Sequence, residues 1–135
     1  MARGERLAIL YDGDCGFCIW VLAWLLRWDR RRALTAVSIQ SAEGERLLCE
    51  VAPERRLLSW HAREGREPVR SGGAALPGVL ARLPLGAPLA ALTSRFPRAT
   101  EAAYGWVAAN RGWLGRLVPR ASKDRARALI ALRMH

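Results

Sequence analysis

The 135-residue chain has only three cysteines, a single lysine and no long hydrophobic run. Three is an odd number, and only Cys15 and Cys18 are close in sequence, so the chain is not a secreted disulfide framework. The longest apolar run, Ile19 to Leu26, is far shorter than the roughly 20 residues that span a bilayer. The run from Leu7 to Leu10 is too short for a signal peptide. Together with an apolar content of 51%, which is enough for a core, these absences predict a cytoplasmic globular protein.

The formal net charge is +10, but nearly all the basic residues are arginines scattered from Arg3 to Arg133. Scattered charge argues against a nucleic-acid footprint. Only Arg30 to Arg32 form a tight run, which we interpret as the solvated end of a helix, with a contact to phosphate or anionic lipid as the alternative. The charge therefore predicts no nucleic-acid partner and leaves a peripheral membrane contact open.

The segment YDGDCGFC, Tyr11 to Cys18, places two cysteines three residues apart between an apolar strand and an apolar helix. A helix start presents unpaired N–H groups and the positive end of the helix dipole, which lower the pKa of a thiol. Cys18 lies one helical turn behind Cys15, close enough to close a small disulfide ring. We therefore predict a thiol–disulfide oxidoreductase in which Cys15 attacks a substrate disulfide and Cys18 resolves the mixed disulfide.

Asp12 and Asp14 are the other candidate catalytic residues. A carboxylate beside Cys15 raises the thiol pKa and so opposes the helix terminus. One role for either aspartate is to accept the Cys18 proton during resolution. The structural alternative, which we favour for Asp14, is to cap the turn. An Asp-x-Asp after a strand is also typical of haloacid-dehalogenase-like phosphatases, but the downstream lysine and acidic pair of that family are missing.

A zinc site is an alternative use of the two cysteines, with Cys49 and His61 as further ligands. The signal is weak, because structural zinc sites usually show a second close pair. We interpret Cys49 as a core thiol and His61 as an ordinary strand residue.

The hydrophobic pattern predicts the order β-α-β-α-β-β-α, followed by further helices. The predicted strands are 7–11, 33–39, 56–62 and 67–70, and the predicted helices are 15–28, 41–51, 74–83, 88–95 and 98–110. This is the element order of the thioredoxin fold, an α/β architecture with a mixed sheet. We assign residues 1–118 to one thioredoxin-like domain with a C-terminal helical extension. Residues 119–135 form a basic tail, in which Lys123 to Arg133 either add a last turn or fray.

Three tryptophans, Trp20, Trp24 and Trp28, recur every four residues and share one face of the first helix. We expect them to pack in the core, with contact to a partner or a membrane surface as the alternative.

The motif and its Trp- and Leu-rich helix resemble the DCC family (DUF393) of predicted thiol–disulfide oxidoreductases, whose signature is Asp-x-x-Cys-x-x-Cys. Asp12, Cys15 and Cys18 match this signature, and the segments Ser71 to Pro84 and Tyr104 to Leu117 are similar to further parts of the family pattern. The resemblance implies a thioredoxin-like fold, a redox role for the two cysteines, and no metal or organic cofactor. The substrate would be a disulfide-containing protein or small molecule, and the electron donor stays open.

Better-studied thioredoxin-like enzymes carry a cis-proline immediately before the third strand, whereas Pro53 lies several residues too early here. Asn110 and Arg111 match an Asn-Arg pair of the DCC family, and we favour a helix end over an approach to the active site for this pair. The alternative to an enzyme is a non-catalytic thioredoxin-like module that binds a protein or a membrane surface.

Overall fold

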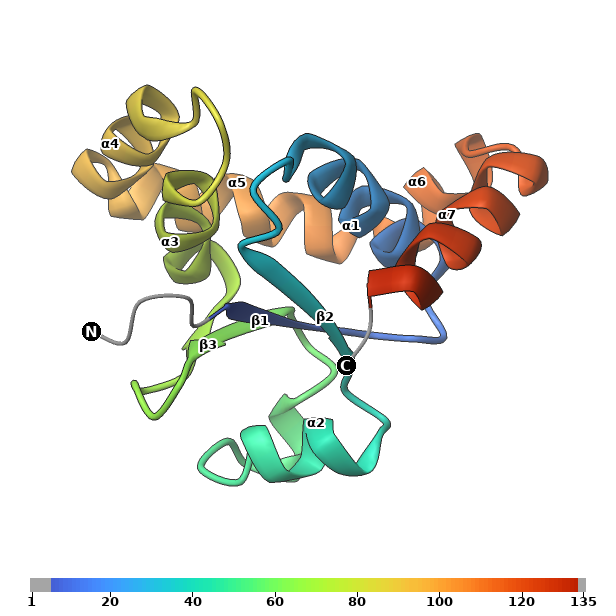
Figure 1. The fold of residues 1–135 in the computed structure, drawn as a ribbon, viewed down its shortest axis with the longest axis horizontal. Coiled ribbons are helices and arrows are strands. Elements are labelled where there is room, and N and C mark those ends of the chain that lie inside the picture. The colour runs from blue at the N-terminus through green and yellow to red at the C-terminus, as the bar shows by residue number, and fades with distance from the viewer. Residues whose placement is uncertain (1–5, 134–135) are drawn as a thin grey trace.

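The computed structural model describes residues 6–133 and consists of a four-stranded sheet with helices on both faces (Figure 1). The strands are β1 (Leu7–Tyr11), β2 (Leu34–Ser38), β3 (His61–Glu64) and β4 (Arg70–Ser71). The α-helices are α1 (Gly16–Trp28), α2 (Ala42–Leu47), α3 (Leu76–Ala81), α4 (Ala87–Arg95), α5 (Pro97–Ala109), α6 (Arg111–Leu117) and α7 (Arg120–Arg133). Two 3-10 helices, η1 (Pro53–Arg55) and η2 (Gly72–Ala75), flank the β3–β4 hairpin.

The strand order is β2-β1-β3-β4, so β1 is an inner strand. β2 runs parallel to β1, with Leu7 opposite Leu34 and Tyr11 opposite Ser38, because α1 carries the chain back to the start of the sheet. β3 is antiparallel to β1, and β4 is antiparallel to β3. This mixed sheet and the order βαβαββα, with additional C-terminal helices, confirm the predicted thioredoxin-like fold.

The sheet separates two apolar clusters. The larger lies between the sheet and the helices on one face, and the smaller lies beneath α2 on the other face (Figure 1). Ile9 belongs to the larger cluster and Leu10 to the smaller, and both are fully buried. Because its two faces are both covered, β1 has the continuous apolar sequence that is typical of an inner strand. The chain after β1 therefore emerges from a fixed position at the edge of the core.

The hairpin differs from the prediction, because the strand expected at 56–62 begins only at His61. The backbone groups of residues 56–60 have other partners. The Arg56 carbonyl contacts Nε2 of His61 at 2.8 Å, and the Trp60 N–H donates to the Tyr104 hydroxyl at 2.8 Å. These contacts replace strand pairing and bring the loop toward α5.

Residues 119–135, set apart above as a basic tail, contain the 14-residue helix α7 rather than a last turn. Its Ala126 and Ile130 are buried in the larger cluster, against α1. The apolar stripe of α7 is narrow and its other positions are mostly charged, which is why the pattern is weak in the sequence.

The expected burial of the tryptophan face of α1 is only partly correct. Trp28 is partly buried and its indole N–H donates to the Pro84 carbonyl at 2.7 Å. Trp20 is partly buried between Phe17 and Trp24. Trp24, however, is 56% exposed, because α6 and α7 pack against other sides of α1. None of the helices within residues 6–133 has both the length and the apolar character needed to cross a bilayer.

Candidate functional site

The cysteine pair lies where β1 passes into α1. The loop is closed by two hydrogen bonds, from the Cys15 N–H to the Asp12 carbonyl at 3.1 Å and from the Asp14 N–H to the Asp12 carboxylate at 2.9 Å. This turn ends the strand and starts the helix within four residues. Cys15 is the N-cap of α1, and its Sγ accepts the N–H of Cys18 at 3.4 Å. The N-cap residue, Cys15, is therefore also the candidate nucleophile. Asp14 does not cap the helix, so the capping role expected for it is wrong.

The two thiols are in direct contact. The Cys18 S–H donates to Cys15 Sγ, with 2.9 Å between the sulfurs, and both cysteines are free and partly buried. A disulfide has an S–S length of about 2.05 Å, so the pair closes with a shift of about 1 Å. The arrangement supports reversible oxidation of this pair.

The same contact separates the pKa values of the two thiols. The pKa of Cys15 falls from 9.0 to about 6, mainly because the Cys18 S–H donates to it, and further through the Cys18 N–H and the nearby Arg111; burial and Asp12 oppose this. The pKa of Cys18 rises, because its proton is held by Cys15, because the thiol is buried, and because of the negative charge on Cys15. Cys15 is therefore the thiolate, and Cys18 keeps its proton.

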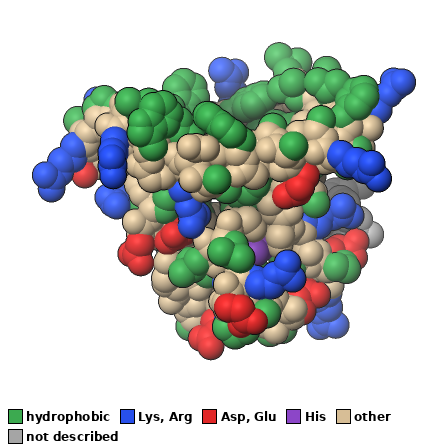
Figure 2. All heavy atoms as spheres, turned by 180° about the vertical axis from the view of Figure 1, so that it is seen from behind, with side chains coloured by type: hydrophobic (Ala, Val, Ile, Leu, Met, Phe, Trp, Pro, Cys, Tyr) green, Lys and Arg blue, Asp and Glu red, His purple; other side chains and the backbone are tan. Residues whose placement is uncertain are grey.

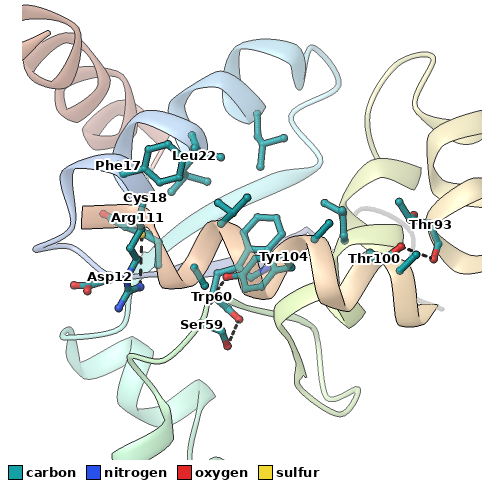
Figure 3. Close-up of a pocket in the computed structure, with 18 of the residues that line it drawn as sticks. Asp12, Phe17, Cys18, Leu22, Ser59, Trp60, Thr93, Thr100, Tyr104 and Arg111 are labelled. Carbon is teal, nitrogen blue, oxygen red and sulfur yellow. Dashed lines mark hydrogen bonds between the residues drawn. The ribbon is translucent and has the colours of Figure 1, made fainter. Parts of the chain in front are cut away.

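Arg111 lies beside the cysteine pair. The helix-end role favoured for this residue in the sequence is therefore wrong. It begins α6, and its guanidinium lies 3.8 Å from Cys18 Sγ and donates to the Leu57 carbonyl at 2.8 Å. Asn110 does end α5 as its C-cap. Burial lowers the pKa of Arg111, but the negative charges on both thiolates and on Asp12 together raise it above its ordinary value. Figure 3 shows the guanidinium beside Cys18 and near Asp12. It provides a fixed positive charge next to the thiol that would resolve a mixed disulfide.

Gln40 holds the aspartate loop from the neighbouring strand. Its side-chain N–H donates to the Asp12 carboxylate at 2.8 Å and to Asp14 at 3.5 Å, and its carbonyl accepts the Gly13 N–H at 3.0 Å. Gln40 follows β2, whose end lies beside that of β1. No motif marks Gln40 in the sequence; its position just after a strand parallel to β1 is the signal that could have identified it, because polar residues after parallel strands commonly meet at one edge of a sheet.

An apolar groove extends from Cys18 along α5. Its volume is about 610 Å³, and α1, α4, α5 and the loop before β3 form its walls (Figure 3). Cys18, Asp12 and Arg111 lie at one end, and Thr93 and Thr100 lie at the other. The remaining lining is almost entirely apolar or aromatic. A disulfide at the pair would therefore be next to a surface suited to apolar substrate groups.

Trp60 and Tyr104 form the groove wall at the place before the third strand. Their rings stack with 6.0 Å between centroids, and the Trp60 indole N–H donates to the Gly72 carbonyl at 2.8 Å. Burial raises the pKa of Tyr104 to about 12, so its hydroxyl stays neutral and accepts the Trp60 N–H. All peptide bonds of the described residues are trans. An aromatic pair thus occupies the region in which related enzymes place a cis-proline.

The residues of the zinc alternative do not come together. Cys49 is exposed rather than in the core, because α2 ends at Leu47 and Leu48 is the residue that enters the smaller cluster. His61 is a buried strand residue, as predicted, with Nδ1 2.6 Å from the Ser71 hydroxyl and Nε2 on the Arg56 carbonyl. In residues 6–133, no three His, Cys, Asp or Glu side chains are grouped so that they could hold a metal ion.

Comparison with known proteins supplies one match. No curated protein and no solved structure matches the chain significantly. The family model of DCC1-like thiol-disulfide oxidoreductases matches residues 9–117, which include the whole β1–α1 junction and Arg111. The chain belongs to the DCC1-like thiol-disulfide oxidoreductase family.

Proposed function

We propose that the protein is a dithiol–disulfide oxidoreductase in which Cys15 is the nucleophile and Cys18 the resolving thiol. The observation that carries this proposal is the 2.9 Å contact between the two sulfurs, with the Cys15 pKa lowered to about 6. A thiol with this pKa is mostly thiolate at neutral pH, and the thiolate is the species that attacks a disulfide.

In the first step the Cys15 thiolate attacks one sulfur of the substrate disulfide. A Cys15–substrate bond forms, the substrate S–S bond breaks, and the other sulfur leaves as a thiolate that takes a proton. In the second step Cys18 loses its proton and attacks Cys15 Sγ. The second substrate thiolate leaves, so two electrons have passed from the dithiol to the substrate. The reverse sequence oxidises a substrate dithiol. A dithiol donor reduces the pair again after the forward reaction, and a disulfide acceptor oxidises it again after the reverse reaction.

The second step needs a deprotonated Cys18. Once Cys15 is in a mixed disulfide, it no longer accepts the Cys18 proton or carries a negative charge, which removes two of the three causes that raise the Cys18 pKa. Arg111 remains and favours the Cys18 thiolate. We assign Asp12 as the proton acceptor, because it lines the same end of the groove. Asp14 is exposed, and we assign it to holding Gln40 and the loop.

The groove supports a substrate whose disulfide is flanked by apolar groups, in a protein or a small molecule. Only two of the three cysteines are close in sequence, unlike the disulfide framework of a secreted protein, so we place the reaction in the cytoplasm.

The test is a redox titration with alkylation and mass analysis of the wild type, Cys15→Ser and Cys18→Ser. Cys49 is exposed on the same chain and serves as an internal reference thiol. We expect a reversible Cys15–Cys18 disulfide in the wild type, and a mixed disulfide with an added test disulfide that accumulates in Cys18→Ser but not in Cys15→Ser. If Cys15 reacts no faster than Cys49 at neutral pH, or if the pair never oxidises, the enzyme is excluded and the non-catalytic module remains.

A further inference from the structure

A large apolar surface is exposed on the helices that cover the groove. Figure 2 shows hydrophobic side chains gathered along the upper edge of the face on which α5 lies. The large exposed side chains of α4 to α6 and of the turns that join them are Leu89, Leu92, Phe96, Trp106, Trp113 and Leu117, each between 45% and 64% exposed. We call this set the α4–α6 face. Soluble monomers rarely expose so many large apolar groups together unless another surface binds them.

Most of the net charge lies in the C-terminal half of the chain, where α4 to α6 supply +3 and α7 supplies +4. Residues 72–135 carry ten Lys and Arg against two Asp and Glu, so this half supplies +8 of the net charge of +10. Arg95, Arg98 and Arg116 are exposed on α4 to α6. The guanidinium of Arg95 lies over the Phe96 ring, 5.8 Å from its centroid. Exposed basic side chains therefore lie on the same three helices as the exposed aromatic side chains.

The only carboxylate on α4 to α6 does not neutralise this surface. Glu101 is directed toward the start of η2, where its Oε2 accepts the Gly73 N–H at 3.1 Å. Ten of the twelve acidic residues precede residue 72, and Figure 2 shows most acidic side chains over the lower part of the molecule, away from the apolar edge.

The groove described above opens among the same residues. Leu92 and Phe96 line the groove and are also about half exposed. The α4–α6 face is therefore hollowed, and its hollow leads to Cys18.

We propose that the α4–α6 face docks on the surface of an anionic phospholipid bilayer. Tryptophan rings prefer the level of the headgroups, and each arginine near an anionic surface contributes attraction. The leucines would enter the boundary of the acyl chains, as in other proteins that bind in the interface plane. The choice of a bilayer rests on charge: a protein partner would need a broad acidic and apolar face, whereas a sheet of phosphates complements arginines spread over three helices.

Docking would place the mouth of the groove against the lipid. An apolar disulfide substrate would then reach the cysteine pair from the bilayer side without crossing water. The docking itself does not involve the thiols, so it stands or fails separately from the proposed redox reaction.

The test is flotation of the full chain with vesicles of phosphatidylcholine alone and with about 30% phosphatidylglycerol. We expect the protein to float with the anionic vesicles only, its tryptophan emission to shift to the blue, and binding to fall as salt is raised. Cys15→Ser should bind as the wild type does. Absence of binding to the anionic vesicles, or equal binding to both kinds of vesicle, would overturn the proposal.

Two test variants, each with a control variant elsewhere on the chain, locate the surface. Trp106→Ser with Trp113→Ser should weaken binding by about tenfold or more, whereas Leu132→Ser should not, because Leu132 is 77% exposed on α7. Figure 1 shows α7 in front of α1 and α5 behind it. Arg95→Gln with Arg98→Gln should weaken binding by about tenfold or more. Arg55→Gln with Arg66→Gln removes the same charge from the half of the chain that contains most of the acidic residues, and should weaken binding clearly less.

Equal effects of the test and control variants would show that the chain binds lipid through general charge, and would refute the α4–α6 face. A concentration-dependent dimer that disappears in the Trp106→Ser, Trp113→Ser variant, with no vesicle binding by the wild type, would assign the face to a second copy instead. Because the substituted tryptophan, leucine and arginine side chains are exposed, unchanged circular dichroism is expected. The salt dependence of the wild type tests the charge argument without any variant.

Discussion

The guanidinium of Arg111 lies 3.8 Å from Cys18 Sγ, although the two residues are 93 positions apart. The same guanidinium anchors the loop before β3 through the Leu57 carbonyl. One residue thus joins the cysteine pair, the start of α6 and the groove wall. It is the main addition that the tertiary structure makes to the cysteine motif.

Replacing Arg111 tests this relationship. In Arg111→Met the thiolate of Cys15 loses an attractive charge, so its pKa should rise and its alkylation should slow roughly threefold to fivefold near pH 6. The measurement is the pH profile of alkylation. Arg111→Lys should restore part of the rate. Arg116→Met is the matched control, because Arg116 is exposed on the same helix. An unchanged profile in Arg111→Met would remove Arg111 from the site.

The stability of the reduced protein should depend on pH through Cys15. Its folded pKa of about 6 lies below the unfolded value near 9, so the stabilisation is fully present above the unfolded value and is lost as pH falls through the folded one. The free energy of unfolding should therefore rise between about pH 6 and pH 9 in the wild type and rise less in Cys15→Ser. Urea unfolding under reducing conditions measures both. Parallel curves for the two proteins would show that Cys15 is an ordinary thiol.

Tyr104→Phe should weaken the groove wall. The variant keeps the stacked ring but leaves the Trp60 N–H without its hydroxyl acceptor, at a cost of about 1–2 kcal/mol. Chemical denaturation gives this cost, and the exchange rate of the Trp60 amide should increase as well. Full protection of that amide in the variant would mean that the hydroxyl is not its partner.

Replacement by alanine should have opposite effects on the stability of the fold at two of the glycines. At Gly44 a Cβ would lie 2.2 Å from the Ser38 carbonyl oxygen, so Gly44→Ala should destabilise the fold by about 2 kcal/mol or more. At Gly105, in α5, nothing lies within 4 Å of a Cβ, so Gly105→Ala should stabilise the helix by about 0.5–1 kcal/mol. Thermal melts of the pair measure the contrast. A mild effect at Gly44 would show that α2 can move away from β2.

Gly44 also shows the limit of reading propensity alone. A glycine inside a predicted helix lowers the expectation of a helix, yet α2 forms here with Ser41 as its N-cap, as predicted. The glycine is required because the helix starts directly on the end of β2. That close approach is a tertiary fact, and it has no signature in the local pattern.

The elements that the sequence determines by itself are those with strong local signals. The buried strand β1, the apolar helix α1 and the parallel β2 follow from hydrophobic spacing, and the family signature at Asp12, Cys15 and Cys18 follows from the motif. These features depend on residues close in the chain, so the local sequence contains their cause. The short strand β3 and the helix α7 are not determined locally, since their limits depend on distant partners such as Tyr104 and α1.

What only the tertiary structure decided is the environment of the cysteine pair. The order of the two thiol pKa values depends on a 2.9 Å contact between side chains, and the charge beside them comes from a residue on the sixth helix. Cys49 is exposed and Trp24 is only half covered, because burial depends on which helices pack nearby, and spacing cannot specify that. Local chemistry placed the two thiols at the start of a helix, and distant contacts set the difference between them.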